Sequence, residues 1–122
     1  MTDVFVYGTL MRGFPQGAML KRFPHVAATT AGRIYRLPAG YPALRVGADG
    51  TVHGELVRGV DDRVLRLLDQ YEGVDEGLYT REPIEVVSGL RQFAAEAWVM
   101  SDPEARGGVW IPTGRWSGAI RR

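Results

Sequence analysis

Cysteine is absent from the chain, and its absence excludes several classes of chemistry. Without a thiol there is no cysteine nucleophile, no disulfide framework, no thiolate metal site and no thiol-based redox switch. Histidine is scarce as well, because only His25 and His53 occur. Neither histidine stands among other ligand residues at metal-binding spacing, so the sequence predicts no metal site.

Lysine is almost as rare, and the basic residues are nearly all arginine. Lys21 is the single lysine, beside fourteen arginines. Arginine suits phosphate groups, so a nucleic-acid binder is one hypothesis, whose sign would be a steep salt dependence of binding. However, the arginines are scattered among acidic residues without a basic block, and the net charge is +1. This pattern favours a compositional habit of the source genome, and we expect no nucleic-acid partner.

Long hydrophobic runs are also missing, and the first residues lack the basic and apolar regions of a secretion signal. The sequence therefore predicts a cytoplasmic protein that has no membrane partner. Its 122 residues, of which 45% are hydrophobic and 24% charged, suit a single globular domain over residues 1–122. A monomer is the default expectation.

Glycine and proline, in contrast, are spread along the chain as turn signals, which is typical of short strands joined by turns. A short helix is predicted for residues 18–23, and hairpin turns for residues 48–50 and at Gly89. Strand patterns cover residues 3–7, 26–37, 44–46, 52–57, 79–88 and 92–100. The predicted fold class is therefore mixed α/β (α+β), a small curled sheet or barrel of about six strands with one or two flanking helices.

The clearest helix is predicted for residues 61–72, with Asp61 as its N-cap and Gly73 just after its last turn. On a helical wheel, Glu72 lies on the flank of the apolar stripe, whereas Asp69 points to the far, solvated side. The stripe consists of Val60, Val64, Leu65, Leu67, Leu68 and Tyr71. Burial and the negative end of the helix dipole raise the pKa of such a carboxyl group toward that of a general base or acid. A plain surface glutamate is the alternative.

Two residues of the next predicted strand are candidates for positioning Glu72. Tyr79 and Arg81 stand seven and nine residues beyond it, and the period of two in a strand puts both on one face. A phenol and a guanidinium beside a carboxylate would hold it in place. A cross-strand packing pair, or a surface ion pair between Arg81 and Glu72, is the alternative.

The first predicted strand runs directly into Tyr7, Gly8, Thr9 and Leu10. A strand that ends in a tight bend exposes backbone N–H groups, which can receive a carboxylate or a developing oxyanion. A simple strand-to-loop turn in which Gly8 relieves strain is the alternative. Together with a half-buried carboxylate, such a bend supplies the minimum set for proton-transfer chemistry on an anionic substrate.

Read together, these segments resemble the gamma-glutamylcyclotransferase-like family, in particular its gamma-glutamylamine cyclotransferase branch. The combination of Tyr-Gly-Thr-Leu with Leu-Asp-x-x-Glu-Gly and Leu-Tyr-x-Arg is the specific part of the pattern. The resemblance follows the chain in order through VFVYGTLMRG at 4–13, GRIYRL at 32–37, GYPAL at 40–44, VHGELV at 52–57, LLDQYEG at 67–73, LYTREPIEV at 78–86, AWVM at 97–100 and IPTGRW at 111–116.

The resemblance implies a small barrel with a cavity at one end and a reaction within a small γ-glutamyl substrate. The substrate's α-amine attacks its own γ-carbonyl, which releases 5-oxoproline and an amine or amino acid. The family's catalytic glutamate falls on Glu72, and its substrate-binding loop falls on the bend from Tyr7 to Leu10. Tyr79 is a further candidate for substrate binding, and Arg81 and Tyr41 are candidates for support. No cofactor is expected.

A second function remains open at this point, namely a non-catalytic module that binds a small anion through the same bend. In that case Glu72 would be dispensable for binding. The loops at residues 11–17 and 101–109 are expected to shape the amine side of the cavity, the second as a candidate lid. We expect the tryptophans in the core rather than in a binding surface, namely Trp98, Trp110 and Trp116.

Overall fold

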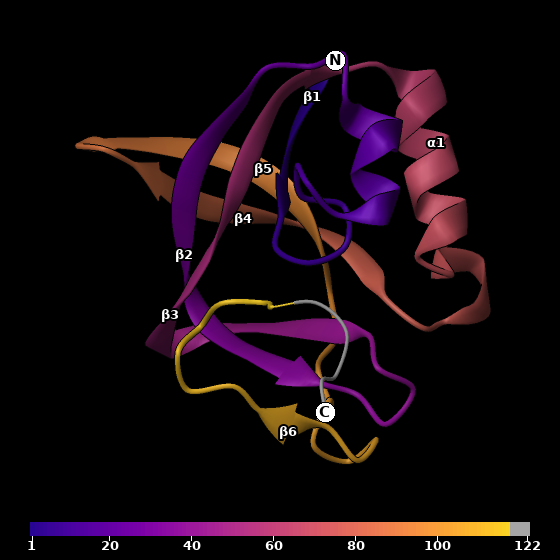
Figure 1. The fold of residues 1–122 in the computed structure, drawn as a ribbon, viewed down its shortest axis with the longest axis vertical. Helices are drawn as coiled ribbons and strands as arrows, with labels where there is room; N and C mark the ends of the chain where they lie inside the picture. Colours follow the sequence, from indigo (N-terminus) through magenta and orange to yellow (C-terminus); the bar gives the residue numbers. More distant parts are fainter. Residues whose placement is uncertain (118–122) are drawn as a thin grey trace.

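Five strands close into a small barrel in the computed structural model, which describes residues 1–117 (Figure 1). Around the ring, β1 pairs with β3, β3 with β2, β2 with β4, β4 with β5, and β5 with β1, and β6 adds to β2. The strands are β1 (Thr2–Val6), β2 (His25–Arg36), β3 (Pro42–Val60), β4 (Thr80–Ser88), β5 (Arg91–Val99) and β6 (Val109–Trp110). The predicted fold class is confirmed. The predicted domain extends to residues 118–122, which lie outside the described residues.

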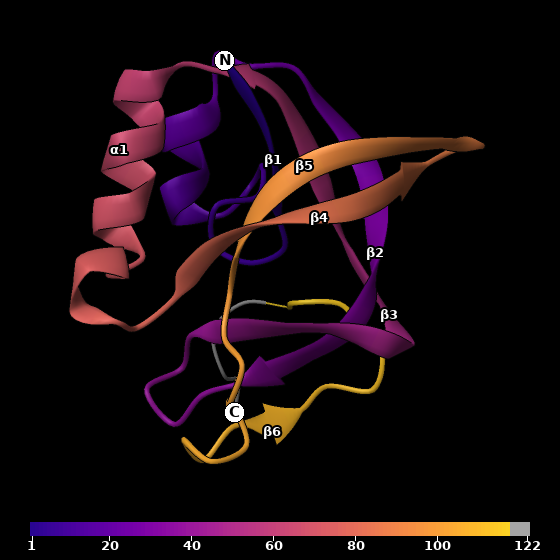
Figure 2. The ribbon, with the colours of Figure 1, turned by 180° about the vertical axis from the view of Figure 1, so that it is seen from behind.

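Among residues 1–117, one α-helix and two short 3₁₀ helices accompany the barrel. Figures 1 and 2 show α1 (Asp62–Tyr71) beside η1 (Pro15–Leu20) on one flank of the barrel, and η2 (Val74–Glu76) follows α1. The helix η1 starts earlier than the expected 18–23 because Pro15 stands in its first turn, where a missing N–H costs nothing. None of the helices in the described part of the chain is long and apolar enough to cross a bilayer.

The ends of α1 follow the predicted signals. Asp61 is the N-cap, and its carboxylate accepts a hydrogen bond from the amide of Val64 at 2.9 Å. Glu72 is the C-cap, and Gly73 follows with φ +70°, a left-handed conformation that glycine adopts without strain. The sequence signals thus fix where the helix ends, and thereby where the Glu72 side chain starts.

The predicted hairpin turn at residues 48–50 is wrong. The strand β3 continues through this segment, and its pairing with β2 jumps from Ala31 opposite Thr51 to Gly32 opposite Val46. Residues 47–50 therefore form a bulge in one long strand. Glycine-rich turn signals suit a bulge as well as a hairpin, and pairing of β3 with the same strand β2 on both sides of the segment decides for the bulge.

The core has two parts, one on each face of β1. Val4 and Val6 pack in the cluster that holds Leu65 and Leu68 of α1, whereas Phe5 belongs to the cluster inside the barrel. This alternation follows from the period of two in a strand. Because both faces of β1 are buried, the bend that follows it starts from a firmly held position between the barrel and α1.

Two expectations about buried side chains need correction. Trp98 and Trp116 are buried as expected, but Trp110 is 44% exposed because β6 lies at the edge of the sheet, where β2 is its one partner among the described strands. On α1, Leu67 and Tyr71 are also exposed, so the buried stripe is narrower than the helical wheel suggests.

Candidate active site

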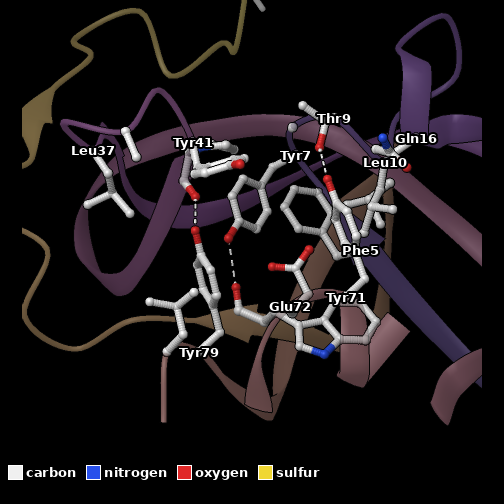
Figure 3. Close-up of a pocket in the computed structure, with 16 residues that line it drawn as sticks. Phe5, Tyr7, Thr9, Leu10, Gln16, Leu37, Tyr41, Tyr71, Glu72 and Tyr79 are labelled. Carbon is white, nitrogen blue, oxygen red and sulfur yellow. Dashed lines mark hydrogen bonds between the residues drawn. The ribbon is translucent and has the colours of Figure 1, made fainter. Parts of the chain in front are cut away.

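A cavity of about 470 Å³ lies where the ends of β1 and α1 meet the starts of β3 and β4 (Figure 3). It brings together two segments that are far apart in the sequence. Tyr7, Gly8, Thr9 and Leu10 line one part of it, and Glu72 lies across from them. The candidate carboxylate and the candidate donor bend therefore face the same hollow.

The carboxyl group of Glu72 is partly buried and points into the cavity (Figure 3). The helix holds its backbone, because the amide of Glu72 donates to the carbonyl of Leu68 at 2.9 Å. Within residues 1–117 its carboxylate has no hydrogen bond or ion pair. Burial raises the pKa of Glu72 from 4.5 to about 7, so this group gains and loses a proton near neutral pH.

The bend supplies unengaged backbone donors. The amide of Met11 closes the bend by donating to the carbonyl of Gly8 at 3.0 Å. Among the residues described, no acceptor is recorded for the amides of Gly8, Thr9 and Leu10. A Cβ atom on Gly8 would lie 2.4 Å from Cγ of Pro42, so the bend approaches β3 this closely only with glycine at that position.

Two tyrosines form walls of the cavity and have their hydroxyl groups engaged. Tyr7 donates to the carbonyl of Trp98 at 2.7 Å, and Tyr79 donates to the carbonyl of Pro42 at 2.5 Å. Burial, together with the charge of Glu72, raises the pKa of both phenols above the usual value. Both groups keep their protons near neutral pH, so they position rings and backbone rather than exchange protons.

Several residues that sequence reasoning did not single out also line the cavity. Tyr71 faces Thr9, with their hydroxyl oxygens 3.1 Å apart, which ties the bend to α1. Gln16 reaches the cavity from η1, and Leu37 reaches it from the turn after β2. For Tyr71 a signal was available, because it directly precedes Glu72, but its helical spacing assigned it to the core. Tyr41, predicted as a supporting residue, lies at the rim and is 56% exposed.

Arg81 does not lie beside Glu72, which corrects its expected place. Its Nε donates to Asp69 at 2.8 Å, and its Nη1 donates to Glu96. Asp69, expected to be solvated, also accepts from the indole N–H of Trp98 at 2.9 Å. The reason is that the last turn of α1 packs against the start of β4 and the end of β5, so the far side of the helix is covered there.

The loop at residues 101–109 contributes no side chain to the cavity lining of the described protein, contrary to expectation. It folds on itself, with the amide of Gly108 donating to the carbonyl of Pro103 at 2.8 Å. Glu104 attaches it to Arg45 of β3 at 2.7 Å. Its role as a lid stays a prediction. Of the other expected loop, residues 11–17, Gln16 lines the cavity.

The family described as "Gamma-glutamyl cyclotransferase, AIG2-like" matches residues 4–118. The chain belongs to this family. The resemblance read from the motifs is thereby confirmed.

Within residues 1–117, no cluster of three or more histidine, aspartate or glutamate side chains is arranged to hold a metal ion.

The chain is similar to curated proteins that are longer than it is. AIG2-like protein C of Arabidopsis thaliana is 32% identical over 115 residues, which are 88% of this chain and 65% of that protein. Gamma-glutamylaminecyclotransferase of Homo sapiens is 37% identical over 97 residues, which are 70% of this chain and 62% of that protein. The chain thus spans less than two thirds of the length of these relatives.

Solved structures share the AIG2-like fold. An AIG2-like protein from Mus musculus matches with a TM-score of 0.76 and 22% identity, covering 100% of this chain and 97% of that one. At this identity the match shows the fold alone. The solution structure of an Arabidopsis thaliana protein matches with a TM-score of 0.67 and 31% identity, covering 80% of this chain and 67% of that one.

Proposed function

We propose that this protein is a cyclotransferase that converts a γ-glutamyl amide or amine to 5-oxoproline and releases the amine, with Glu72 moving the proton. One observation carries the proposal: within the described residues, an unpaired carboxyl group with a pKa of about 7 lines the same cavity as a tight bend whose amides have no intramolecular acceptor. Membership in the family and the name of the human relative, gamma-glutamylaminecyclotransferase, support the reaction class.

The first task of such an enzyme is to make the substrate's α-amine nucleophilic. The amine stands on the same carbon as a free carboxylate, which keeps its pKa well above 7, so it is almost entirely an ammonium group at neutral pH. The pKa of Glu72 is about 7, so its carboxylate accepts the proton at a smaller cost than an ordinary carboxylate would. The freed amine then forms a bond to the γ-carbon and closes a five-membered ring. Much of the rate comes from cavity walls that hold the substrate folded.

The second task is to stabilise the charge that ring closure creates. Attack at the γ-carbonyl turns its oxygen into an oxyanion, and fixed backbone N–H groups stabilise such a charge better than water does. The amides of Gly8, Thr9 and Leu10 are the available donors beside the cavity. They bind either this oxyanion or the carboxylate of the γ-glutamyl group.

The third task is to release the amine. The leaving nitrogen must gain a proton before its bond to the γ-carbon breaks. Glu72 returns the proton that it took from the α-ammonium group to the leaving nitrogen, which restores the carboxylate. Attack leaves the ring nitrogen with one proton more than the lactam keeps, and the restored carboxylate takes this second proton and passes it to the departing amine. No side chain forms a bond to the substrate, which agrees with a chain that has no cysteine.

The decisive variant is Glu72→Gln, which keeps the shape of the side chain and removes its titration. We expect 5-oxoproline release to fall by about 10²–10⁴-fold, the usual contribution of a positioned acid–base group. Circular dichroism and thermal unfolding should show an intact fold. Glu76→Gln, at an exposed glutamate just after the helix, is the matched control and should keep wild-type turnover. Wild-type turnover in Glu72→Gln would contradict the mechanism.

The non-catalytic alternative is separated by a second measurement. Calorimetry with 5-oxoproline and γ-glutamyl compounds reports binding, and a turnover assay reports product. Binding without product in the wild-type protein would favour an anion-binding module on the same fold. Product formation that depends on Glu72 supports the enzyme.

A further inference from the structure

The cavity has two unlike sides, and Glu72 lies between them (Figure 3). On one side lie the polar groups of Thr9 and Gln16, together with the apolar side chains of Phe5 and Leu10, and this side adjoins the bend whose amides have no acceptor among the described residues. On the other side lie Leu37 and Tyr41. A γ-glutamyl group is polar at its α-carbon, so its head fits the side of the bend. The leaving amine then extends toward the side of Leu37 and Tyr41.

The side of Leu37 and Tyr41, called the apolar side below, is already shaped without a bound substrate. Leu37, Ala39 and Tyr41 belong to one tight turn, in which the amide of Leu37 donates to the carbonyl of Tyr41 at 2.8 Å. Leu78 contributes from the segment that leads into β4. Tyr41 is 56% exposed and Leu78 is 41% exposed, so apolar surface faces water at the rim. An apolar group that covers this surface is favoured, because it removes apolar area from water.

The charges around the cavity restrict the charge that the leaving amine can carry. Of the described residues that line it, Glu72 is the only aspartate, glutamate, lysine, arginine or histidine. A leaving group with its own carboxylate would lie near Glu72 with no lining cation to pair with it. A leaving group with an ammonium would favour the charged form of Glu72 and lower its pKa, which weakens it as a base. Neither charge suits the reaction.

Arg106 lies outside the cavity lining, but its charge acts on Tyr79 in the cavity wall. Its charge lowers the pKa of Tyr79 slightly, against the larger effect of burial. However, Arg106 does not line the cavity, and its Nε pairs with Asp102 on the same loop at 3.1 Å. Its own partner therefore occupies it, and among the described residues the apolar side gains no lining cation from this loop.

We propose that Leu37, Tyr41 and Leu78 form the subsite for the leaving amine, and that this amine carries an uncharged alkyl or arylalkyl group. The inference rests on the proposed function and names its substrate class. In the reaction, the bond between the γ-carbon and this amine breaks, and the bond from the α-nitrogen to the γ-carbon takes its place. Both protons that the α-ammonium group loses go to the departing nitrogen, which leaves over the apolar rim as an ammonium group.

A panel of γ-glutamyl compounds tests the proposal through kcat/KM, with the release of 5-oxoproline as the signal. It contains the benzylamine amide, the methylamine amide, the alanine dipeptide and the mono-amide of 1,4-diaminobutane. We expect the benzylamine amide to exceed both charged compounds by about tenfold or more, which is what a matched apolar pocket provides. The methylamine amide should fall below it, because it reaches little of the rim.

Variants of Tyr41 test whether the rim of the cavity causes the preference for the benzylamine amide. Tyr41→Ser should lower kcat/KM for the benzylamine amide about tenfold and lower kcat/KM for the methylamine amide much less. Tyr41→Phe, which keeps the ring, should retain the preference. Leu90→Ser is the control, because Leu90 is 104% exposed in the turn between β4 and β5, away from the cavity lining. It should change neither rate.

Four results would overturn the inference. Charged compounds that react as fast as the benzylamine amide would show that the leaving group is chosen by other contacts. An equal loss for both amides in Tyr41→Ser would show that Tyr41 acts on the whole reaction. Product from no compound would overturn the proposed function together with the subsite. Product from the charged compounds alone leaves the proposed function standing and rejects only the subsite.

Discussion

The indole N–H of Trp98 donates to Oδ1 of Asp69 at 2.9 Å and so joins the cavity wall to the last turn of α1. The same oxygen accepts from Nε of Arg81 at 2.8 Å, and Arg81 also reaches Glu96 of β5. Glu72 follows Asp69 by three residues at the end of the same helix. Its position relative to the cavity is therefore set by contacts from two strands as well as by the helix.

Asp69→Asn tests this network. The variant keeps the size of the side chain but removes the charge that Arg81 pairs with, so we expect unfolding free energy to fall by about 1–3 kcal/mol. Because Glu72 loses its fixed position, kcat for the cyclisation should fall more than KM changes. Denaturant unfolding and steady-state kinetics measure the two effects.

The control for this network is Asp75→Asn, at an exposed aspartate in η2 just beyond the helix. It should leave both stability and kcat near the wild-type values. If Asp69→Asn lowered stability but kept the wild-type kcat, the network would hold the fold without placing Glu72.

The sequence predicts well the features that depend on residues close together along the chain. The Asp61 cap, the glycine after the helix and the rise in the pKa of Glu72 all follow from residues a few positions apart or from a simple burial argument. The strand that ends in a donor bend is equally local. These features place both halves of the candidate site on the correct elements.

What the sequence does not predict is which neighbours cover each element. A helical wheel assumes a single packing face, and it therefore sends Asp69 to solvent, whereas the end of α1 also meets Arg81 and Trp98. In the same way, residues 48–50 carry a turn signal that serves equally in a bulge, and only the partner strand decides. The place of the 101–109 loop depends on its pairing with Arg45, which no local pattern reveals.

Stability should depend on pH through Glu72. Its pKa is about 7 in the folded protein and 4.5 as the ordinary value, so the folded state holds the proton more tightly. The stabilisation is complete below pH about 4.5 and is lost as the pH rises through 7. Relative to Glu72→Gln, the wild-type protein should therefore lose up to about 3 kcal/mol of unfolding free energy between these limits. Urea unfolding of both proteins at pH 4.5, 6 and 8 measures the difference, and a constant difference would contradict a raised pKa.

The activity should follow the same titration in the opposite sense. The reaction starts from the carboxylate form of Glu72, so kcat/KM should rise with pH and level off above an apparent pKa of about 7. The range from pH 5 to 7.5 is informative because the substrate amine titrates above it. Initial rates of 5-oxoproline release in buffers of constant ionic strength provide the profile. A rate that is flat from pH 5.5 to 7.5 would show that another group takes the proton.

Gly8→Ala tests whether the bend must approach β3 as closely as it does. The added Cβ would lie 2.4 Å from Cγ of Pro42, and the proline ring is too rigid to move aside, so the bend itself must shift. A displacement of this kind turns the amides of Gly8, Thr9 and Leu10 away from the substrate. We expect kcat/KM to fall about 100-fold, as for small misplacements in other active sites, with a cost to stability of about 1–3 kcal/mol.

Gly47→Ala is the matched control for this change, because Gly47 has open space where a Cβ would stand and does not require a positive φ. It should keep wild-type kinetics and stability. Thermal unfolding separates a displaced bend from a damaged fold, since only the first lowers kcat/KM far more than it lowers stability. If Gly8→Ala kept full activity, the amides of the bend would not be the groups that stabilise the oxyanion, and the donors would have to be sought elsewhere on the cavity wall.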